Sequence, residues 1–73
     1  MAPIDPSYKE KIGNRIAEQR VKKNLGVREL ALIAEIEHHQ LINIEKGRVD
    51  LRVSTLLKIA GGLDLKAKDL LDF

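Results

Sequence analysis

Only three residues, 35–37, separate two stretches of the chain that have the apolar spacing of a helix. These stretches, 27–34 and 38–46, place apolar residues three or four positions apart, so that they share one face. A connection this short does not return the second helix antiparallel to the first. It fits two helices that cross at a steep angle, which is the geometry of a helix-turn-helix. Ala31 is expected at the crossing, because only a small side chain allows so close an approach.

Three further helices are expected around this pair, at 9–23, 52–63 and 67–71. The first repeats large side chains every four positions, which gives one narrow buried stripe, and no part of the chain alternates as a strand does. Asn24 and Gly47 stand where helices are expected to stop. The expected fold class is therefore all-α, a compact bundle of five short helices joined by tight connections.

The chain of 73 residues has room for one small domain. We expect residues 9–73 to form it, with the helix-turn-helix at about 27–46, and residues 1–8, which hold both prolines, to form a flexible arm. The absence of cysteine excludes disulfides and thiolate metal sites and suits a reducing cytoplasm. No signal-peptide pattern and no apolar stretch of membrane-spanning length occurs, so a cytoplasmic protein without a membrane partner is expected.

The net charge is only +2, but the charge is unevenly distributed. Residues 9–28 have seven Lys or Arg against two Glu, a local charge of +5, whereas residues 29–45 have four Glu and no Lys or Arg. A basic first third indicates a polyanion as partner, while the modest net charge argues against a purely electrostatic binder. A solvated helix face is the simpler explanation for such a run of charges.

Two adjacent histidines, His38 and His39, begin the stretch 38–46. A zinc site needs histidines at i and i+4, or ligands from several segments. These two lie about one hundred degrees apart around a helix, and no third histidine exists to join them. Catalysis is also unsupported, because no serine, threonine or lysine stands in a recognisable motif with a base. We therefore expect no enzyme activity, no metal and no cofactor.

Four motifs, IGNRIAEQR, ELALIAEI, INIEKGR and STLLKIAGGLDL followed by DLL, occur in this order along the chain. Each is weak alone, but in this order and spacing they are specific. Over residues 12–71 the chain resembles the Cro and phage-repressor type of helix-turn-helix protein, the Xre-like family. The resemblance implies a five-helix, lambda-repressor-like DNA-binding domain. It also implies a homodimeric transcriptional regulator, such as a repressor, that reads the major groove of a palindromic operator with its third helix.

The resemblance also implies roles for single residues of this chain. Arg20 and Glu45 match the family's buried ion pair, and a bidentate arginine–carboxylate fork can lock the angle of the reading helix. The implied base-reading residues are Glu37, His38, His39, Gln40, Ile42 and Asn43. The implied phosphate contacts are Lys46, Arg48 and Arg52. His, Gln and Asn side chains both donate and accept hydrogen bonds, as base edges require.

Three features depart from the family's pattern. Gly26 and Val27 replace a common Ser-Gln pair, of which the serine caps the second helix and the glutamine touches phosphate. Glu35 replaces the usual turn glycine, at a position that often needs a positive φ. Glu37 replaces a capping serine or threonine and brings a carboxylate near the groove, where it repels phosphate or accepts from cytosine. The alternative function is therefore an antitoxin-like or partner-binding protein-interaction module on the same fold, with weak or lost DNA binding.

The C-terminal third holds more apolar side chains than a small bundle is expected to cover. We expect a symmetric homodimer through the fourth-to-fifth helix region. The expected interface residues are Leu63, Leu65, Leu70, Leu71 and Phe73. The simpler alternative is that these five side chains complete the core of the monomer. The resemblance covers repressors and activators, phage repressors, restriction–modification controllers and antitoxins alike, and the chain has no room for a ligand-sensing domain, so no small-molecule effector is expected.

Overall fold

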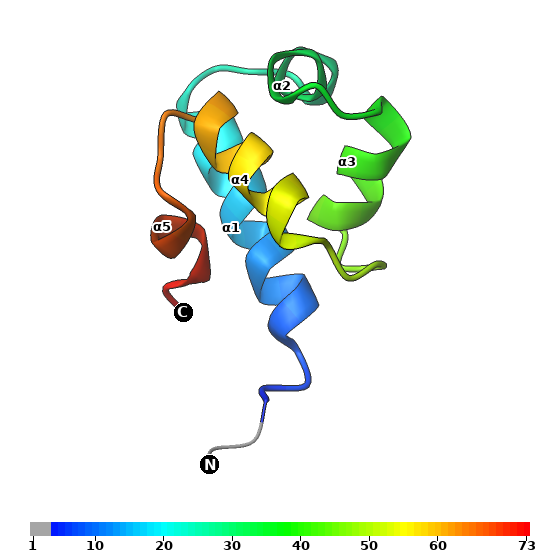
Figure 1. Ribbon diagram of the computed structural model, residues 1–73, viewed down its shortest axis with the longest axis vertical. Helices are drawn as coiled ribbons and strands as arrows, with labels where there is room; N and C mark the ends of the chain where they lie inside the picture. Colours follow the sequence, from blue (N-terminus) through cyan, green and yellow to red (C-terminus); the bar gives the residue numbers. More distant parts are fainter. Residues whose placement is uncertain (1–3) are drawn as a thin grey trace.

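The computed structural model describes residues 4–73 and contains five helices in this range (Figure 1). They are α1 (Tyr8–Lys22), α2 (Val27–Ala34), α3 (His38–Glu45), α4 (Val53–Gly62) and α5 (Ala67–Leu71). No strand occurs among these described residues, so the expected all-α class is confirmed. The bounds of α2 and α5 are as expected, and the other three helices differ by one residue at their ends. Within 4–73, no helix combines the length and the apolar character needed to cross a membrane.

Part of the expected N-terminal arm, residues 1–3, lies outside the described residues. Tyr8, which the sequence placed in the arm, is instead the first residue of α1. Asp5 accepts hydrogen bonds from the Ser7 N–H at 2.9 Å and the Ser7 Oγ at 2.7 Å, and it forms an ion pair with Lys11 of α1. The Lys11 contact and then the Ser7 contacts lower the pKa of the Asp5 carboxyl to about 2. Residues 5–7 are thus fastened to the start of α1.

The helices enclose one core of aliphatic side chains. Their contacts close a ring in which α1 packs against α3, α3 against α2, α2 against α4, α4 against α5, and α5 against α1 (Figure 1). The large, fully buried side chains are Ile16, Leu30, Leu41, Ile59, Leu63 and Leu70. Every helix supplies at least one of them. Since each such side chain stabilises the fold by about 1.5–3 kcal/mol on burial, no helix is peripheral.

Two residues of the expected dimer interface belong to this core instead. Leu63 and Leu70 are fully buried within the single chain and cannot contact a second copy, so these two assignments were wrong. Both lie in the α4–α5 region, whose packing against α1 completes the ring of helices. Leu65 is half buried and packs against the same core. Only Leu71 and Phe73 stay exposed, at 44% and 55%.

Four of the helices end in the same backbone motif. The residue with positive φ is Asn24 after α1, Glu35 after α2, Gly47 after α3 and Asp64 after α4. The N–H of the following residue donates to a carbonyl five positions earlier, at 2.8 to 3.1 Å. This Schellman motif satisfies carbonyls that the helix end would leave unpaired. In three of the four motifs the following residue is apolar and packs against the core, namely Leu25, Ile36 and Leu65.

Replacing Glu35 with glycine is expected to raise the free energy of unfolding by up to about 1 kcal/mol. Glu35 has φ 58° and ψ 45°, a conformation that costs a residue with a Cβ about 1–2 kcal/mol. Glycine avoids that cost but loses more backbone entropy on folding, which cancels part of the gain. Urea melts measure the difference. Glu35→Ala is the control, because it keeps the Cβ and its strain; an equal gain for alanine would trace the effect to the lost carboxylate instead.

Candidate nucleic-acid interface

The turn between α2 and α3 sets the direction of α3. Glu35 turns the backbone away from α2, and Ile36 packs against the core beneath the turn. Ala31 is buried, and its carbonyl accepts a hydrogen bond from the Ile36 N–H at 3.0 Å. Leu41 and Ile44 bury the inner side of α3. Two short helices joined by three residues thus form the expected helix-turn-helix, with the opposite side of α3 facing solvent.

A pair of charged side chains ties the C-terminal end of α3 to α1. Arg20 Nε donates to Glu45 Oε2 at 2.8 Å, and Arg20 Nη2 donates to Glu45 Oε1 at 3.0 Å. Arg20 Nη1 donates to the Leu25 carbonyl at 2.9 Å, which anchors the arginine to the loop after α1. The two side chains are only 15% and 9% exposed. The structure therefore brings this pair together as a bidentate fork, which restrains both the position and the rotation of α3.

A glycine lets α1 and α3 approach each other beside this pair. A Cβ added to Gly13 would lie 2.4 Å from the Ile44 carbonyl oxygen and 2.6 Å from that of Glu45. No side chain fits there, because both neighbours are backbone atoms. Gly13 was not among the residues expected to matter from the sequence. The available signal was an isolated glycine inside a helical pattern, which costs about 1 kcal/mol relative to alanine and therefore indicates a packing reason.

Three side chains share the outward face of α3. His39, Asn43 and Lys46 lie at i, i+4 and i+7, on the side opposite the buried Leu41 and Ile44. His39 and Lys46 are exposed, and Asn43 is half buried. This face has hydrogen-bonding groups in its centre and a positive charge at the C-terminal end of the helix.

The remaining residues of α3 that were assigned to base reading lie beside this face. Gln40 is exposed on one flank, and Ile42 is half buried on the other. His38 is half buried in the first turn, with its ring centroid 5.6 Å from that of His39. Partial burial lowers the pKa of His38, and the charges of Arg28 and His39 lower it further. The His38 imidazole is therefore mainly neutral at pH 7 and offers one donor and one acceptor.

Both helices of the motif begin without a side-chain cap. Glu37 occupies the N-cap position of α3, makes no capping hydrogen bond and leaves its carboxylate exposed. Gly26 precedes α2 and donates its N–H to Glu29 Oε1 at 2.9 Å, which is the half of a capping box that needs no cap side chain. Val27, which stands where the family commonly has glutamine, packs against the core. Among these residues only Glu37 brings an added charge close to the outward face of α3.

The three residues assigned to phosphate are exposed around the loop between α3 and α4. They are Lys46, Arg48 and Arg52. A polar hollow of about 320 Å³ lies between α3, this loop and α4, and Gln40, Arg52 and Lys58 line it. Lys58 was not predicted from the sequence, although its position four residues after Ser54 places the two side chains on one face of α4. The hollow thus brings two cationic side chains and two hydroxyl groups together beside α3, and its lining also includes the Asp50 carboxylate, which accepts from the Tyr8 hydroxyl.

Arg48 differs from the other two cations because its side chain has a partner on α3. Arg48 Nη1 donates a hydrogen bond to Asn43 Oδ1 at 3.3 Å. A phosphate-contacting residue and a base-reading residue, assigned separately from the sequence, are therefore joined in the structure.

Two further side chains that sequence analysis did not single out fasten α1 to distant parts of the chain. The Tyr8 hydroxyl donates to Asp50 Oδ2 at 2.6 Å, in the loop before α4, and this bond raises the pKa of Tyr8. Arg15 Nε donates to the Asp69 carbonyl at 2.9 Å, in α5. The partners are 42 and 54 residues away along the chain, so no local pattern points to either contact.

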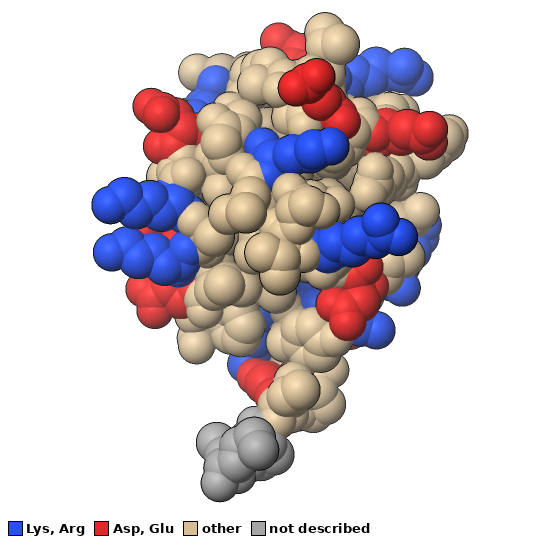
Figure 2. All heavy atoms as spheres, viewed as in Figure 1, with Lys and Arg blue, Asp and Glu red and all other residues tan. Residues whose placement is uncertain are grey.

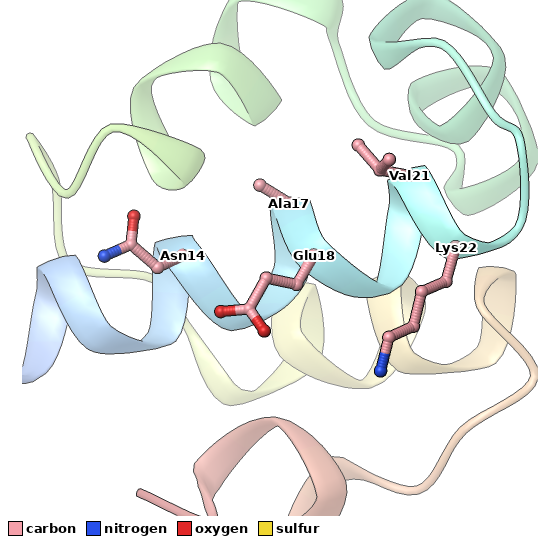
Figure 3. Close-up of a pocket in the computed structure, with 5 residues that line it drawn as sticks. All are labelled: Asn14, Ala17, Glu18, Val21 and Lys22. Atoms are coloured by element: carbon pink, nitrogen blue, oxygen red, sulfur yellow. The ribbon is translucent and has the colours of Figure 1, made fainter.

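Another hollow lies on the exposed side of α1. Its lining residues are Asn14, Ala17, Glu18, Val21 and Lys22 (Figure 3). All of them come from one helix, so the hollow is a shallow depression of that surface rather than a cleft. Across residues 4–73, no group of three or more histidine or acidic side chains is close enough to hold a metal ion.

Known proteins share both the sequence pattern and this arrangement. The model of the helix-turn-helix domain family matches residues 13–72. The restriction-modification controller protein C.AhdI from Aeromonas hydrophila is 28% identical, with a TM-score of 0.82 over 84% of this chain and 92% of that chain. SinR, the master regulator for biofilm formation, whose structure was solved in complex with DNA, is 32% identical, with a TM-score of 0.79 over 84% and 98%. The clp gene regulator ClgR from C. glutamicum is 25% identical, with a TM-score of 0.85 over 92% and 87%.

No curated protein sequence matches the chain. The family model nevertheless spans most of the chain, and the structural neighbours resemble it over nearly their full length. Those neighbours are regulators by name, and the outward face of α3 presents hydrogen-bonding groups. The chain belongs to the helix-turn-helix domain family, of the Cro and Xre-like type, and has the fold of a DNA-binding transcriptional regulator rather than of an enzyme.

Proposed function

We propose that this protein regulates transcription in the cytoplasm by binding a specific palindromic sequence in double-stranded DNA as a homodimer. The observation that supports it most is the outward face of α3, where His39, Asn43 and Lys46 project from a helix that the Arg20–Glu45 fork holds in place. A helix fits the major groove, where each base pair presents its own pattern of donors and acceptors. A rigid support favours specificity, because side chains that are already oriented lose less entropy on binding.

In this arrangement the central side chains of α3 read base edges. His39 and Asn43 reach the base pairs in front of the helix, and Gln40 and Ile42 reach those on either side, with the isoleucine suited to a thymine methyl. His38 and Glu37 lie at the start of the helix, where an amino group of cytosine suits the carboxylate. The neighbour SinR was solved in complex with DNA, and its 32% identity supports the same type of ligand for this chain.

Selection of bound sites from a random pool of double-stranded DNA tests this function. We expect enrichment of a palindrome whose half-sites are centred about 10 base pairs apart. His39→Ala is expected to abolish the preference at one position of each half-site, while the fold persists because the side chain is exposed. A folded wild-type protein that enriches no sequence would contradict the proposal.

A protein-interaction module is the second candidate function. The exposed carboxylate of Glu37 favours it, because it lies at the start of α3 beside the outward face of that helix. A salt titration of whichever complex forms separates the two functions. DNA affinity falls steeply with salt through counterion release, whereas the affinity of a mainly apolar protein interface does not.

Lys46 and Arg52 are expected to contact phosphates. Lys46→Ala or Arg52→Ala should weaken binding to all sequences alike and reduce the slope of log affinity against log salt by about one unit. Exposed Lys23, which follows α1 and is not among the residues assigned to phosphate, provides the control, and Lys23→Ala is expected to leave the slope unchanged. Binding curves at several salt concentrations measure this slope. An Arg52→Ala variant with an altered sequence preference would contradict the assignment of Arg52 to phosphate.

The proposed homodimer uses the apolar side chains of the α4–α5 surface that the core leaves uncovered. Val53 and Leu57 lie at i and i+4 on α4 and are 72% and 56% exposed, and Leu71 and Phe73 follow at the C-terminal end. Figure 2 shows the face on which α4 lies in front, with uncharged residues in its centre and side chains of both charges around them. Such a patch with a charged rim is typical of an interface.

Leu57→Glu is expected to convert the dimer to a monomer without unfolding it, because the exposed side chain contributes little to the core. A carboxylate buried in a symmetric interface would face its own copy across the axis, which is unfavourable. Sedimentation at micromolar concentrations measures the change. The matched control is Leu32→Glu, which alters an 80% exposed leucine on α2 and should leave the dimer intact. A wild-type chain that stays monomeric at high micromolar concentration, with and without DNA, would rule out the dimer.

A further inference from the structure

Arg48 is joined to Asn43 twice. Its backbone N–H donates to the Asn43 carbonyl at 3.0 Å, as part of the Schellman motif that ends α3 at Gly47. Its side chain donates from Nη1 to Asn43 Oδ1 at 3.3 Å. The backbone bond fixes the position of the Arg48 backbone next to Asn43. The end of α3 thus brings the guanidinium within reach of the Asn43 side chain.

The other three Schellman motifs show what is particular about this one. Leu25, Ile36 and Leu65 occupy the position equivalent to Arg48, and each packs an apolar side chain against the core. Arg48 is exposed instead and lies beside the outward face of α3. The nearby carboxylates of Glu45 and Asp50 are engaged by Arg20 and by the Tyr8 hydroxyl. Within residues 4–73 the structure shows no ion pair for Arg48.

The hydrogen bond from Arg48 sets the orientation of the Asn43 side-chain amide. A guanidinium carries only donors, so the amide must turn its oxygen toward Arg48 and its NH2 group away. Paired hydrogen bonding of asparagine to adenine needs both ends of the amide, because the oxygen accepts from N6 and the NH2 group donates to N7. The oxygen keeps a second lone pair, but the bond to Arg48 holds it on the side of the loop and leaves the NH2 group as the end of the amide that is free to turn toward a base.

We propose that Arg48 is a positioning residue that holds the Asn43 oxygen toward the loop, so that Asn43 reads mainly with its NH2 group and prefers guanine or thymine to adenine. Guanine presents O6 and N7 and thymine presents O4 as acceptors in the major groove. This inference rests on the proposed function, since it concerns the base that α3 prefers at one position. It changes the role of Arg48 from one phosphate contact among three to the residue that sets the orientation of a base-reading side chain.

Two measurements on the full chain test it. In the first, without DNA, the side-chain amide resonances of Asn43 are followed by NMR in Arg48→Met, which keeps the length of the side chain but removes its donors. We expect these resonances to shift, and we expect them to stay in place in Arg52→Met, a matched change in the same loop whose side chain makes no hydrogen bond to α3 in the structure. Unmoved Asn43 resonances in Arg48→Met would overturn the proposal.

In the second measurement, site selection is repeated with the wild type and with Asn43→Ala, Arg48→Met and Arg52→Met. The base position that loses its preference in Asn43→Ala is the position that Asn43 reads. We expect guanine or thymine there for the wild type, a shift of about tenfold toward adenine in Arg48→Met, and no shift in Arg52→Met. A wild type that selects adenine, or an Arg48→Met variant that keeps the wild-type base, overturns the inference while the proposed function stands. A wild type that selects no sequence in the pool refutes the proposed function itself.

Discussion

Replacing Arg20 or Glu45 with alanine is expected to lower the free energy of unfolding by about 3–5 kcal/mol. The remaining partner would be a nearly buried charge with no compensating group, since the pair is only 15% and 9% exposed. Arg20→Ala also removes the donor to the Leu25 carbonyl. Because small domains are stable by only about 5–15 kcal/mol, either variant is expected to lie close to unfolding at room temperature.

A double-mutant cycle in urea separates the coupling of this pair from the loss of two unrelated side chains. We expect Arg20→Met combined with Glu45→Leu to recover much of the loss, because it leaves no unpaired charge behind. The control is the exposed pair of Asp5 and Lys11, whose removal by Lys11→Met keeps the hydrogen bonds between Asp5 and Ser7 and should barely move the melt. Small and equal losses for both single variants and the double variant would show that the Arg20–Glu45 contact contributes no coupling energy.

The pair also affects recognition. Glu45 is the last residue of α3, and its carboxylate accepts the two hydrogen bonds by which Arg20 of α1 holds that helix. In a folded variant that lacks the Arg20–Glu45 pair, α3 would be fixed mainly by the packing of its apolar inner side. Such packing allows the helix to rotate slightly about its own axis. Such a rotation would shift His39 and Asn43 relative to the bases, so we expect sequence preference to weaken before general affinity for DNA does.

The positions of the helices followed from the sequence because apolar spacing reports burial directly. Ile16 in α1, Leu30 in α2 and Leu41 in α3 each belong to a set of residues spaced at helical intervals, and all three are fully buried. The stops followed in the same way at Asn24 and Gly47, where residues that tolerate positive φ stand at the ends of α1 and α3. Helix positions and helix ends depend on residues that are close together in the chain, and such neighbours can be read from a single sequence.

The misassigned interface leucines mark the limit of such reasoning. Leu63 and Leu70 complete the core, whereas Leu57, with similar spacing on α4, is 56% exposed. An apolar residue that meets its own core and one that meets a second copy leave the same pattern in a sequence. Only the packing of α4 and α5 on the rest of the ring separates them, and that packing depends on contacts between distant positions.

The candidate site also combines features that follow from local sequence with contacts that depend on the fold. The resemblance to the family pointed to His39 and Asn43 as base-reading residues and to Lys46 as a phosphate contact, and the fixed period of a helix places these three side chains on one face. The hydrogen bond between Arg48 and Asn43 was not foreseeable, because it needs the path of the loop after Gly47. The contribution of Lys58 to the hollow beside α3 depends in the same way on how α4 lies against that loop.

Gly13→Ala is expected to destabilise the protein by about 2 kcal/mol, although alanine favours helices more than any other residue. The new Cβ would lie 2.4 Å from the Ile44 carbonyl oxygen and 2.6 Å from that of Glu45, so α1 and α3 must move apart. Overpacking costs about 1–3 kcal/mol, and the upper end of this range applies here because the new Cβ meets two backbone carbonyl groups. The better helix propensity of alanine returns about 1 kcal/mol of that loss, and backbone atoms cannot swing aside as a side chain can.

The matched control is Gly61→Ala, a glycine in α4 beside which an added Cβ meets nothing within 4 Å. That change should stabilise the fold by about 0.5–1 kcal/mol, so the two glycine-to-alanine variants are expected to shift a urea melt in opposite directions. Gly13→Ala should also weaken sequence preference, because it displaces the end of α3 that carries Glu45 and the turn leading to Arg48. A Gly13→Ala variant that gains stability as Gly61→Ala does would show that α1 and α3 are not in such close contact and that α3 is free to shift on the scaffold.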